Sequence, residues 1–340
     1  MYEQTVRPLN GAGDPLSGGV VATGLGKRFG DLWALRGLDL NVAPGTVLGL
    51  LGHNGAGKTT AIRILTTLSQ ATEGSATVAG IDVAAHPGRV RERIGVAAQQ
   101  ATVDGLMTAR LNLQTIGCLH GMSKAEARRR GDVLLERLDL SEFASKLVRT
   151  YSGGMRRRLD VAASLMGHPE VLFLDEPTTG LDPRSRGDLW EMLRELVREG
   201  TTIILTTQYL EEADRMADDI VVLDHGRTVA HGTPAELKAR IGDDRLDVKV
   251  ANASDLPGAA KAISAFAEEE PTYDMDGLVV TAPIRPGVRV IEVVRALDEA
   301  GIEAIDIARR EATLDDVFMS LTSNSHHHRD DNKDDQRDPI

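Results

Sequence analysis

Short apolar runs alternate with longer amphipathic segments between residues 20 and 235. Val47–Leu51 and Val171–Leu174 are continuous apolar runs of strand length, which predicts buried strands of a parallel sheet. Apolar residues then recur at helical spacing in Thr59–Leu68 and Leu189–Val197. This order of strands and helices predicts an α/β fold.

The segment from about residue 101 to 165 departs from this alternation. Its apolar residues recur mainly at helical spacing, and Ser123 with Glu126 forms a capping box ahead of one predicted helix. We therefore expect a helical subdomain inserted between two halves of the α/β core.

The remaining segments set the expected domain boundaries. Residues 1–18 and 323–340 are polar and without periodicity, which predicts a flexible arm and a disordered tail. Residues 19–240 are expected to form the large α/β domain. Residues 245–322 follow a β-α-β-β-α-β-like pattern, which predicts a small α+β domain for assembly or regulation.

Charge and composition narrow the function classes. The 340 residues carry a net charge of −12, which argues against a nucleic-acid partner. Cys118 is the only cysteine, so a disulfide framework is excluded, and its apolar neighbours predict a buried thiol. Because no apolar run is long enough to span a bilayer, we expect another polypeptide to supply any membrane spans.

One segment fits the phosphate-loop pattern G-x-x-x-x-G-K-[ST] and lies between a predicted strand and a predicted helix. Its glycines allow close approach of backbone to an anion, Lys58 can reach the β- and γ-phosphates, and Thr59 can ligate Mg²⁺. An ordinary glycine-rich turn is the alternative, and it seldom has this context. The predicted nucleotide-binding residues are Gly52, His53, Asn54, Gly55, Ala56, Gly57, Lys58, Thr59 and Thr60.

Two carboxylates follow the second apolar run. Asp175 and Glu176 end a predicted buried strand, where paired acidic groups are costly without a cation. We expect Asp175 to serve Mg²⁺ and Glu176 to polarise the water that attacks the γ-phosphate. Two solvent-exposed carboxylates at a strand end are the alternative interpretation.

Three further signals are weaker. Ser152-Gly153-Gly154 opens an amphipathic helix and offers exposed N–H groups, although any capped helix start looks the same. Phe29 lies in a polar turn, where periodicity favours a core position over contact with a base. Gln99 and Gln208 lie at predicted strand ends, where side chains face a ligand crevice.

In this order and spacing, the segments resemble the ATP-binding subunits of ABC transporters, over about residues 20–235. The resemblance implies a P-loop ABC-type fold in which Phe29 stacks on adenine and Gln99 senses Mg²⁺ and couples to the membrane subunit. It implies that Ser152–Gly154 bind γ-phosphate, and that Asp182 shapes the dimer contact. Two copies would face each other head to tail, each completing the phosphate loop of the other.

Three departures from the common ABC pattern matter. The signature begins with Tyr151 and ends in Met155, where Leu and Gln are usual, which leaves the phosphate contacts of Ser152–Gly154 intact. Gln208 stands where a switch histidine is usual, so its amide can position the γ-phosphate but cannot shuttle a proton. His53 replaces a common proline, and little is expected from it.

A closer resemblance reaches to about Thr322. The strings Tyr151–Arg158, Gly180–Arg186 and Thr206–Asp214 are similar to the daunorubicin-resistance ATP-binding proteins. This implies an ATPase at the cytoplasmic side of the membrane that energises antibiotic export through a separate integral membrane permease.

Two alternatives remain open at this stage, an ABC-type ATPase acting on nucleic acid or ribosomes and a non-transport regulator. The acidic charge and the single cassette disfavour the first. The intact set of Lys58, Asp175 and Glu176 disfavours the second.

Overall fold

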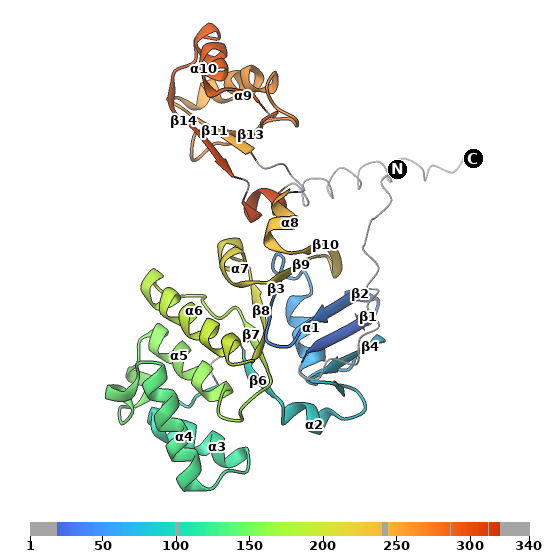
Figure 1. Cartoon of the computed structure of the whole chain (residues 1–340), viewed down its shortest axis with the longest axis vertical. Helices are drawn as coiled ribbons and strands as arrows, with labels where there is room; N and C mark the ends of the chain where they lie inside the picture. Colours follow the sequence, from blue (N-terminus) through green and yellow to red (C-terminus); the bar gives the residue numbers. More distant parts are fainter. Residues whose placement is uncertain (1–18, 99–101, 240–243, 286, 312, 320–340) are drawn as a thin grey trace, which may run out of the picture. The chain divides into compact units, whose positions relative to one another are not determined.

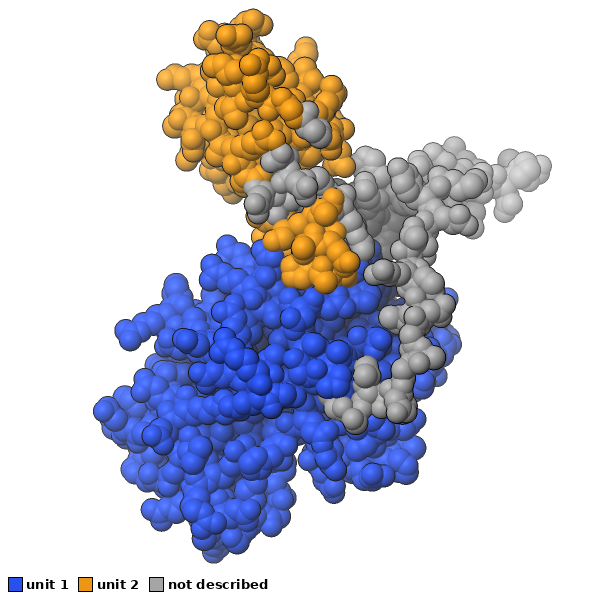
Figure 2. Space-filling view, viewed as in Figure 1, with its two compact units in different colours: residues 1–231 blue, residues 232–340 orange. Residues whose placement is uncertain are grey.

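The computed structural model describes residues 19–98, 102–239, 244–285, 287–311 and 313–319. The chain divides into two compact units, of which the first ends at His231 and the second begins at Gly232 (Figure 2). This division precedes the boundary expected near residue 240, because helix α8 (Pro234–Ala239) groups with the second unit.

A six-stranded sheet forms the centre of the first unit (Figure 1). Every residue of β3, β7 and β8 is buried, as the continuous apolar runs predict. The pairs β6–β7, β7–β8, β8–β3 and β3–β9 are parallel, so their carboxyl ends lie along one edge. The strand order is β10 (Arg227–Gly232), β9 (Asp219–Asp224), β3 (Val47–Leu51), β8 (Thr202–Thr207), β7 (Val171–Asp175) and β6 (Ile94–Ala97).

A second, four-stranded sheet shares a core with the first through helix α1 (Lys58–Leu65). Ile62, Ile64 and Leu65 of this helix are buried in one cluster with side chains of both sheets. This sheet has the order β2 (Leu32–Val42), β1 (Val20–Phe29), β4 (Glu73–Val78) and β5 (Ile81–Asp82), and the short helix α2 (Pro87–Arg91) follows it.

Within residues 102–165, which the structure describes, the predicted helical subdomain contains three α-helices and two 3₁₀ helices. Ser123 caps α4 by accepting a hydrogen bond from the Glu126 backbone N–H, as the capping box predicts. Cys118 is exposed, so the prediction of a buried thiol is wrong. The reason is helix phase, because α3 buries Ala109, Asn112, Leu113 and Gly117 along one face and Cys118 falls outside it.

The helices of the first unit that follow β6 are α3 (Ala109–Leu119), α4 (Lys124–Arg137), α5 (Gly153–Ser164), α6 (Pro183–Arg198) and α7 (Leu210–Met216). Two short 3₁₀ helices, η1 (Ser141–Phe143) and η2 (Val148–Thr150), precede α5.

The second unit has its own sheet and its own apolar core. Helices α9 and α10 contribute Ile263 and Leu297 to that core, and β11 contributes Val248. After α8, its elements are β11 (Asp244–Val250), η3 (Ala253–Asp255), α9 (Leu256–Ser264), β12 (Thr272–Asp274), β13 (Val279–Pro283), α10 (Val290–Glu299) and β14 (Ala304–Glu311), with the sheet order β12-β13-β11-β14. This is the β-α-β-β-α-β succession that the sequence pattern predicts.

None of the helices in the described part of the chain combines the length and apolar character needed to cross a bilayer.

Candidate active site

The phosphate loop connects the carboxyl end of β3 to the amino end of α1, and two of its glycines are required by close packing. Gly52 and Gly57 have φ values of +149° and +111°. A Cβ on Gly52 would lie 2.3 Å from the carbonyl oxygen of Leu223, and one on Gly57 would lie 2.7 Å from that of Ala34. Larger residues would push the loop off the strands behind it.

The loop leaves a rim that a ligand can reach. Asn54, Gly55 and Thr59 are exposed, and Thr60 is half-buried, whereas Ala56 packs inside. The backbone N–H groups at the start of α1 therefore lie beside an open surface, which is the arrangement that binds phosphate.

Lys58 is only 5% exposed, and its ammonium group is held by the loop itself. Nζ donates to the carbonyl oxygens of Gly52 and His53, at 2.6 and 3.1 Å. Burial lowers the pKa of Lys58, while the charges of Glu176 and Asp175 act in the opposite direction. The Lys58 ammonium group therefore lies within electrostatic reach of both acidic residues. The phosphate loop and the acidic pair, which are separate motifs in the sequence, thus form one site.

Asp175 ends β7 with its carboxylate buried. Its Oδ1 accepts a 2.5 Å hydrogen bond from the hydroxyl of Thr206, the residue that faces it on β8. The sequence places Thr206 at a strand end but does not reveal this contact. The signal that could have found it is the register between two adjacent parallel strands.

Glu176 has a left-handed backbone, with φ of +48°. Its N–H donates to the carbonyl and hydroxyl oxygens of Thr206, at 3.1 and 3.0 Å. Such a conformation is uncommon for a residue with a Cβ and is retained where its surroundings enforce it. Thr206 therefore fixes both acidic residues, and Glu176 remains half-buried within electrostatic reach of Lys58.

Arg157 is a residue that the sequence analysis missed. It lies on α5, is 9% exposed, and its guanidinium donates to three backbone carbonyls. The acceptors are Ala98 at 2.6 Å, Asp175 at 2.7 Å and Pro177 at 2.9 Å. A planar fork of donors suits such a divergent set of acceptors, so one side chain joins α5 to the backbone on both sides of Glu176 and to the residue that follows β6.

Asp160, one turn after Arg157, makes a second link of the same kind. Its Oδ1 accepts from the N–H groups of Thr102 and Val103, at 2.7 and 3.3 Å. Burial raises the pKa of Asp160, and those two hydrogen bonds oppose the shift. Gln99 lies outside the described residues, but α5 holds the chain on both sides of it, at Ala98 and Thr102.

The Ser-Gly-Gly segment opens α5 as a capped helix start. The Ser152 hydroxyl accepts from the N–H of Met155 at 3.2 Å, and Ser152 and Gly153 are exposed. Asp182 caps α6 in the same way, accepting from the N–H and hydroxyl of Ser185 at 2.9 and 2.8 Å. The hydrogen bond from the Ser185 backbone lowers the pKa of Asp182.

Phe29 is 55% exposed at the end of β1, so the core position that periodicity favours is wrong. Phe29 is the last residue of β1, next to the turn of residues 30 and 31 that joins β1 to β2. The ring lines a surface pocket together with Thr60 and Arg63 of α1, and Lys27 Nζ lies 5.1 Å from its centroid. Phe29 therefore lies next to the end of the phosphate loop.

Gln208 is exposed directly after β8, at the same sheet edge as Asp175. The residues on either side are fixed, because the Thr207 hydroxyl accepts from the Tyr209 N–H at 2.9 Å and donates to Glu212 at 2.8 Å. The backbone of Gln208 is thus anchored while its side chain faces solvent.

Comparison with known proteins agrees with this geometry. The ABC transporter family model matches residues 35–179. The daunorubicin resistance ATP-binding protein DrrA3 of Streptomyces coeruleorubidus is 53% identical, over 89% of this chain and 95% of that protein. The chain is an ABC transporter ATP-binding protein. The daunorubicin/doxorubicin resistance ATP-binding protein DrrA of Streptomyces peucetius is 44% identical, over 89% of this chain and 92% of that protein.

Solved structures lead to the same ABC family. The ATP-binding subunit of an ABC transporter superposes with a TM-score of 0.60 at 27% identity, over 65% of this chain and 92% of that one. A dimeric ATP-binding cassette in a post-hydrolysis state, bound to ADP and Pi, superposes with a TM-score of 0.59 at 25% identity. The match covers 63% of this chain and 98% of that one. ABC ATP-binding proteins hydrolyse ATP and work with membrane permeases, so this chain is an ATPase of that kind.

Proposed function

We propose that the chain binds and hydrolyses ATP to drive export of a drug or antibiotic through a separate integral membrane permease. The observation that carries the ATPase part is the buried Lys58 beside the Asp175–Glu176 pair, all on one edge of the central sheet. The export part rests on relatives named for daunorubicin and doxorubicin resistance, which match nearly the whole chain. The chain would work on the cytoplasmic side of the membrane, as a peripheral subunit.

In this proposal the nucleotide phosphates lie on the rim of residues 52–60, with Lys58 turning from its loop carbonyls to phosphate oxygens. Phe29 would stack on the adenine, since its ring is exposed beside Thr60. Glu176 would accept a proton from the attacking water, because a half-buried carboxylate held at a fixed backbone position is suited to that task.

The proposed metal ligands are suited to Mg²⁺, because this ion favours oxygen ligands. The buried Asp175 carboxylate and the exposed Thr59 hydroxyl supply such oxygens, and Gln99 is the third proposed ligand. When bound, the ion would neutralise phosphate charge during hydrolysis.

We further propose that two copies pair head to tail around ATP. Ser152 and Gly153 are exposed at the amino end of α5, where N–H groups and the helix dipole attract phosphate. Asp182 opens α6 and would lie at this dimer contact. A related cassette is dimeric in its post-hydrolysis state, which supports the pairing. No nucleic-acid partner is proposed.

Co-expression with the candidate permease tests the export function. Cells that carry both proteins are expected to survive higher daunorubicin or doxorubicin concentrations and to retain less of the fluorescent drug. Lys58→Ala should abolish this protection, because a charge-assisted phosphate contact is lost and ATP binding weakens by about tenfold or more. Lys124→Ala, on the distant helix α4, is the matched control. Equal protection by the Lys58 variant would contradict the proposal.

Gln208 is proposed to position the γ-phosphate without transferring a proton. Gln208→Ala should lower ATP turnover. Gln208→His should retain substantial activity, because glutamine and histidine side chains can both donate a hydrogen bond. Turnover against pH is the deciding measurement. A titration near pH 6 to 7 that disappears on changing residue 208 would be incompatible with the positional role, because glutamine does not ionise there.

Residues 245–322 are proposed to act in assembly or regulation. Their core is separate from the cores of the first unit, and none of the proposed phosphate-binding residues lies in them. Truncation after residue 244 should preserve ATP binding while membrane association and drug resistance are lost. Sedimentation with permease-containing membranes measures the first loss, and full resistance by the truncated chain would refute the assembly role.

A further inference from the structure

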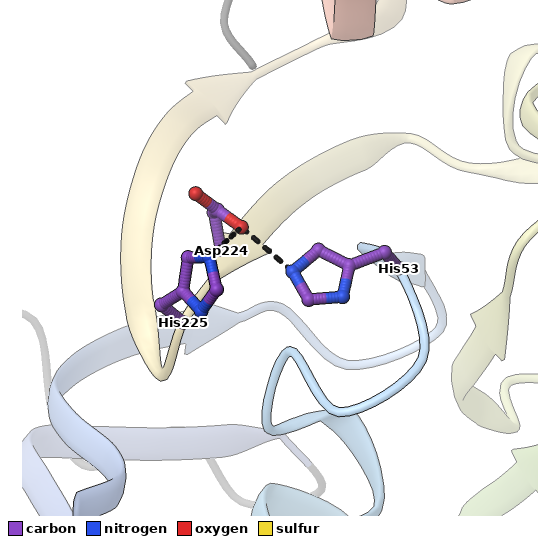
Figure 3. Close-up of side chains that lie close together, drawn as sticks. All are labelled: His53, Asp224 and His225. Atoms are coloured by element: carbon purple, nitrogen blue, oxygen red, sulfur yellow. Dashed lines mark hydrogen bonds and ion pairs between the residues drawn. The ribbon is translucent and has the colours of Figure 1, made fainter. Parts of the chain in front are cut away.

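Three side chains at or beside the phosphate loop are assigned no catalytic role in the proposed hydrolysis, although the backbone of His53 belongs to the proposed phosphate-binding rim. His53 belongs to the loop, Asp224 ends β9, and His225 begins the turn between β9 and β10 (Figure 3). His53 Nε2 lies 2.7 Å from Asp224 Oδ1, and His225 Nε2 lies 3.8 Å from the same oxygen. One ligand atom from each residue lies within 4.8 Å of the other two.

The His53 ring makes two short contacts, but a neutral imidazole has only one N–H to donate. Its Nδ1 lies 2.6 Å from the carbonyl oxygen of Asn54, and its Nε2 lies 2.7 Å from a carboxylate oxygen of Asp224. Both oxygens are acceptors, whereas a neutral imidazole carries a single N–H. The contact between Nε2 and Oδ1 therefore needs either a further proton or a cation between the two atoms.

The backbone holds the two segments together. The N–H of Gly226 donates to the carbonyl oxygen of Ala56 at 2.9 Å, which fixes the β9–β10 turn on the phosphate loop. His225 has a left-handed backbone with φ of +45°, and this turns its ring toward Asp224. The backbone contact between the phosphate loop and the β9–β10 turn therefore holds the three ligand atoms near one another.

Exposure differs within the cluster. The side chain of Asp224 is 10% exposed, and those of His53 and His225 are 39% and 59% exposed. A carboxylate so far removed from water is costly without a compensating positive charge. The imidazoles leave a path by which an ion can enter from solvent.

We propose that His53, Asp224 and His225 form a binding site for a divalent transition-metal ion of the zinc class. Two imidazoles and one carboxylate are a donor set that zinc accepts, with a fourth position for water. Bonds of about 2.0–2.1 Å place tetrahedral ligand atoms about 3.3 Å apart. The 2.7 and 3.8 Å separations lie on either side of that value, so small side-chain movements suffice.

This site is distinct from the one proposed for Mg²⁺. Magnesium favours oxygen ligands in octahedral geometry, whereas two of the three donors here are imidazole nitrogens. A bound ion would join the phosphate loop to the β9–β10 turn. Metal binding at this site would depend on neither drug export nor the proposed catalytic roles.

Calorimetric titration with ZnCl₂ in excess Mg²⁺ tests the site. The protein is the full chain with His326, His327 and His328 changed to alanine, so that these residues do not contribute. One ion per chain is expected, and His225→Asn should weaken binding by at least tenfold. Asparagine is chosen because it tolerates the left-handed backbone at this position. Co²⁺ should give the visible absorption of a four-coordinate ion in the parent and lose it in the variant.

Two further variants complete the test. His53→Gln removes the imidazole from the opposite segment and should weaken binding to a similar extent, with thermal unfolding used to verify the fold. His231→Gln is the control, because His231 also contacts a carboxylate at 2.7 Å, that of Asp219 at the other end of the same hairpin. It should bind Zn²⁺ as the parent does. The proposal would be overturned if the parent did not bind Zn²⁺ or if excess Mg²⁺ displaced the bound ion. It would also be overturned if His225→Asn bound Zn²⁺ as tightly as the parent, or if His231→Gln lost binding to the same extent as His225→Asn.

Discussion

Glu176→Gln is expected to bind ATP with Mg²⁺ and to hydrolyse it about 10²–10⁴-fold more slowly than the native chain, because loss of a general base has typically that effect. The amide keeps the size of the side chain but cannot accept a proton from water. The backbone should not move, since the N–H of residue 176 is held by the carbonyl and hydroxyl oxygens of Thr206 whichever side chain is present. Single-turnover kinetics would separate the chemical step from nucleotide binding.

A slow variant that still binds ATP should also accumulate as the nucleotide-bound dimer, which size-exclusion chromatography can detect. Glu170→Gln is the matched control. Glu170 precedes the first residue of β7 and pairs with Arg93, whereas Glu176 follows its last residue. Near-normal turnover in Glu176→Gln would remove Glu176 from the role of base, and equal slowing in Glu170→Gln would indicate a general effect on the strand.

The sequence could predict the central strands and the two acidic residues because each signal is local. Val47–Leu51 and Val171–Leu174 are apolar at every position, which identifies strands buried on both faces. Parallel strands bring their carboxyl ends to one edge, and this places Asp175 in the same region as the loop after β3. The electrostatic contact of Lys58 with Asp175 agrees with that expectation.

Other parts of the site depend on register and packing, which a single sequence does not contain. Thr206 contacts Asp175 only because β7 and β8 pair in one particular register. Arg157 is one of three consecutive arginines, and nothing in the string distinguishes the one that points inward. The contact of His53 with Asp224 joins residues 171 positions apart. The phase of α3 is not fixed by its sequence either, because the apolar residues Leu111 and Leu119 lie with Cys118 outside its buried face.

Arg157→Ala is expected to destabilise the first unit by about 3 kcal/mol or more, because three carbonyls around a buried guanidinium would lose their donor. The charge also matters. Burial lowers the pKa of Arg157, and the nearby acidic groups Asp160, Asp175 and Glu176 oppose that shift, so its removal takes one neighbouring cation away from them. The midpoint of urea unfolding should fall accordingly.

Arg156→Ala is the control for this change, since among the described residues the adjacent Arg156 makes one long hydrogen bond, of 3.5 Å, to the carbonyl oxygen of Val148. Arg156→Ala should lower the free energy of unfolding by less than about 1 kcal/mol. Arg157→Lys keeps the positive charge but replaces a planar fork by one ammonium group, so an intermediate stability is expected. ATP turnover per folded chain should also fall in both Arg157 variants, because the side chain fixes the backbone at Asp175 and at Ala98, the neighbour of Gln99. If Arg157→Ala and Arg156→Ala unfold at the same urea concentration, the three hydrogen bonds do not hold this site together.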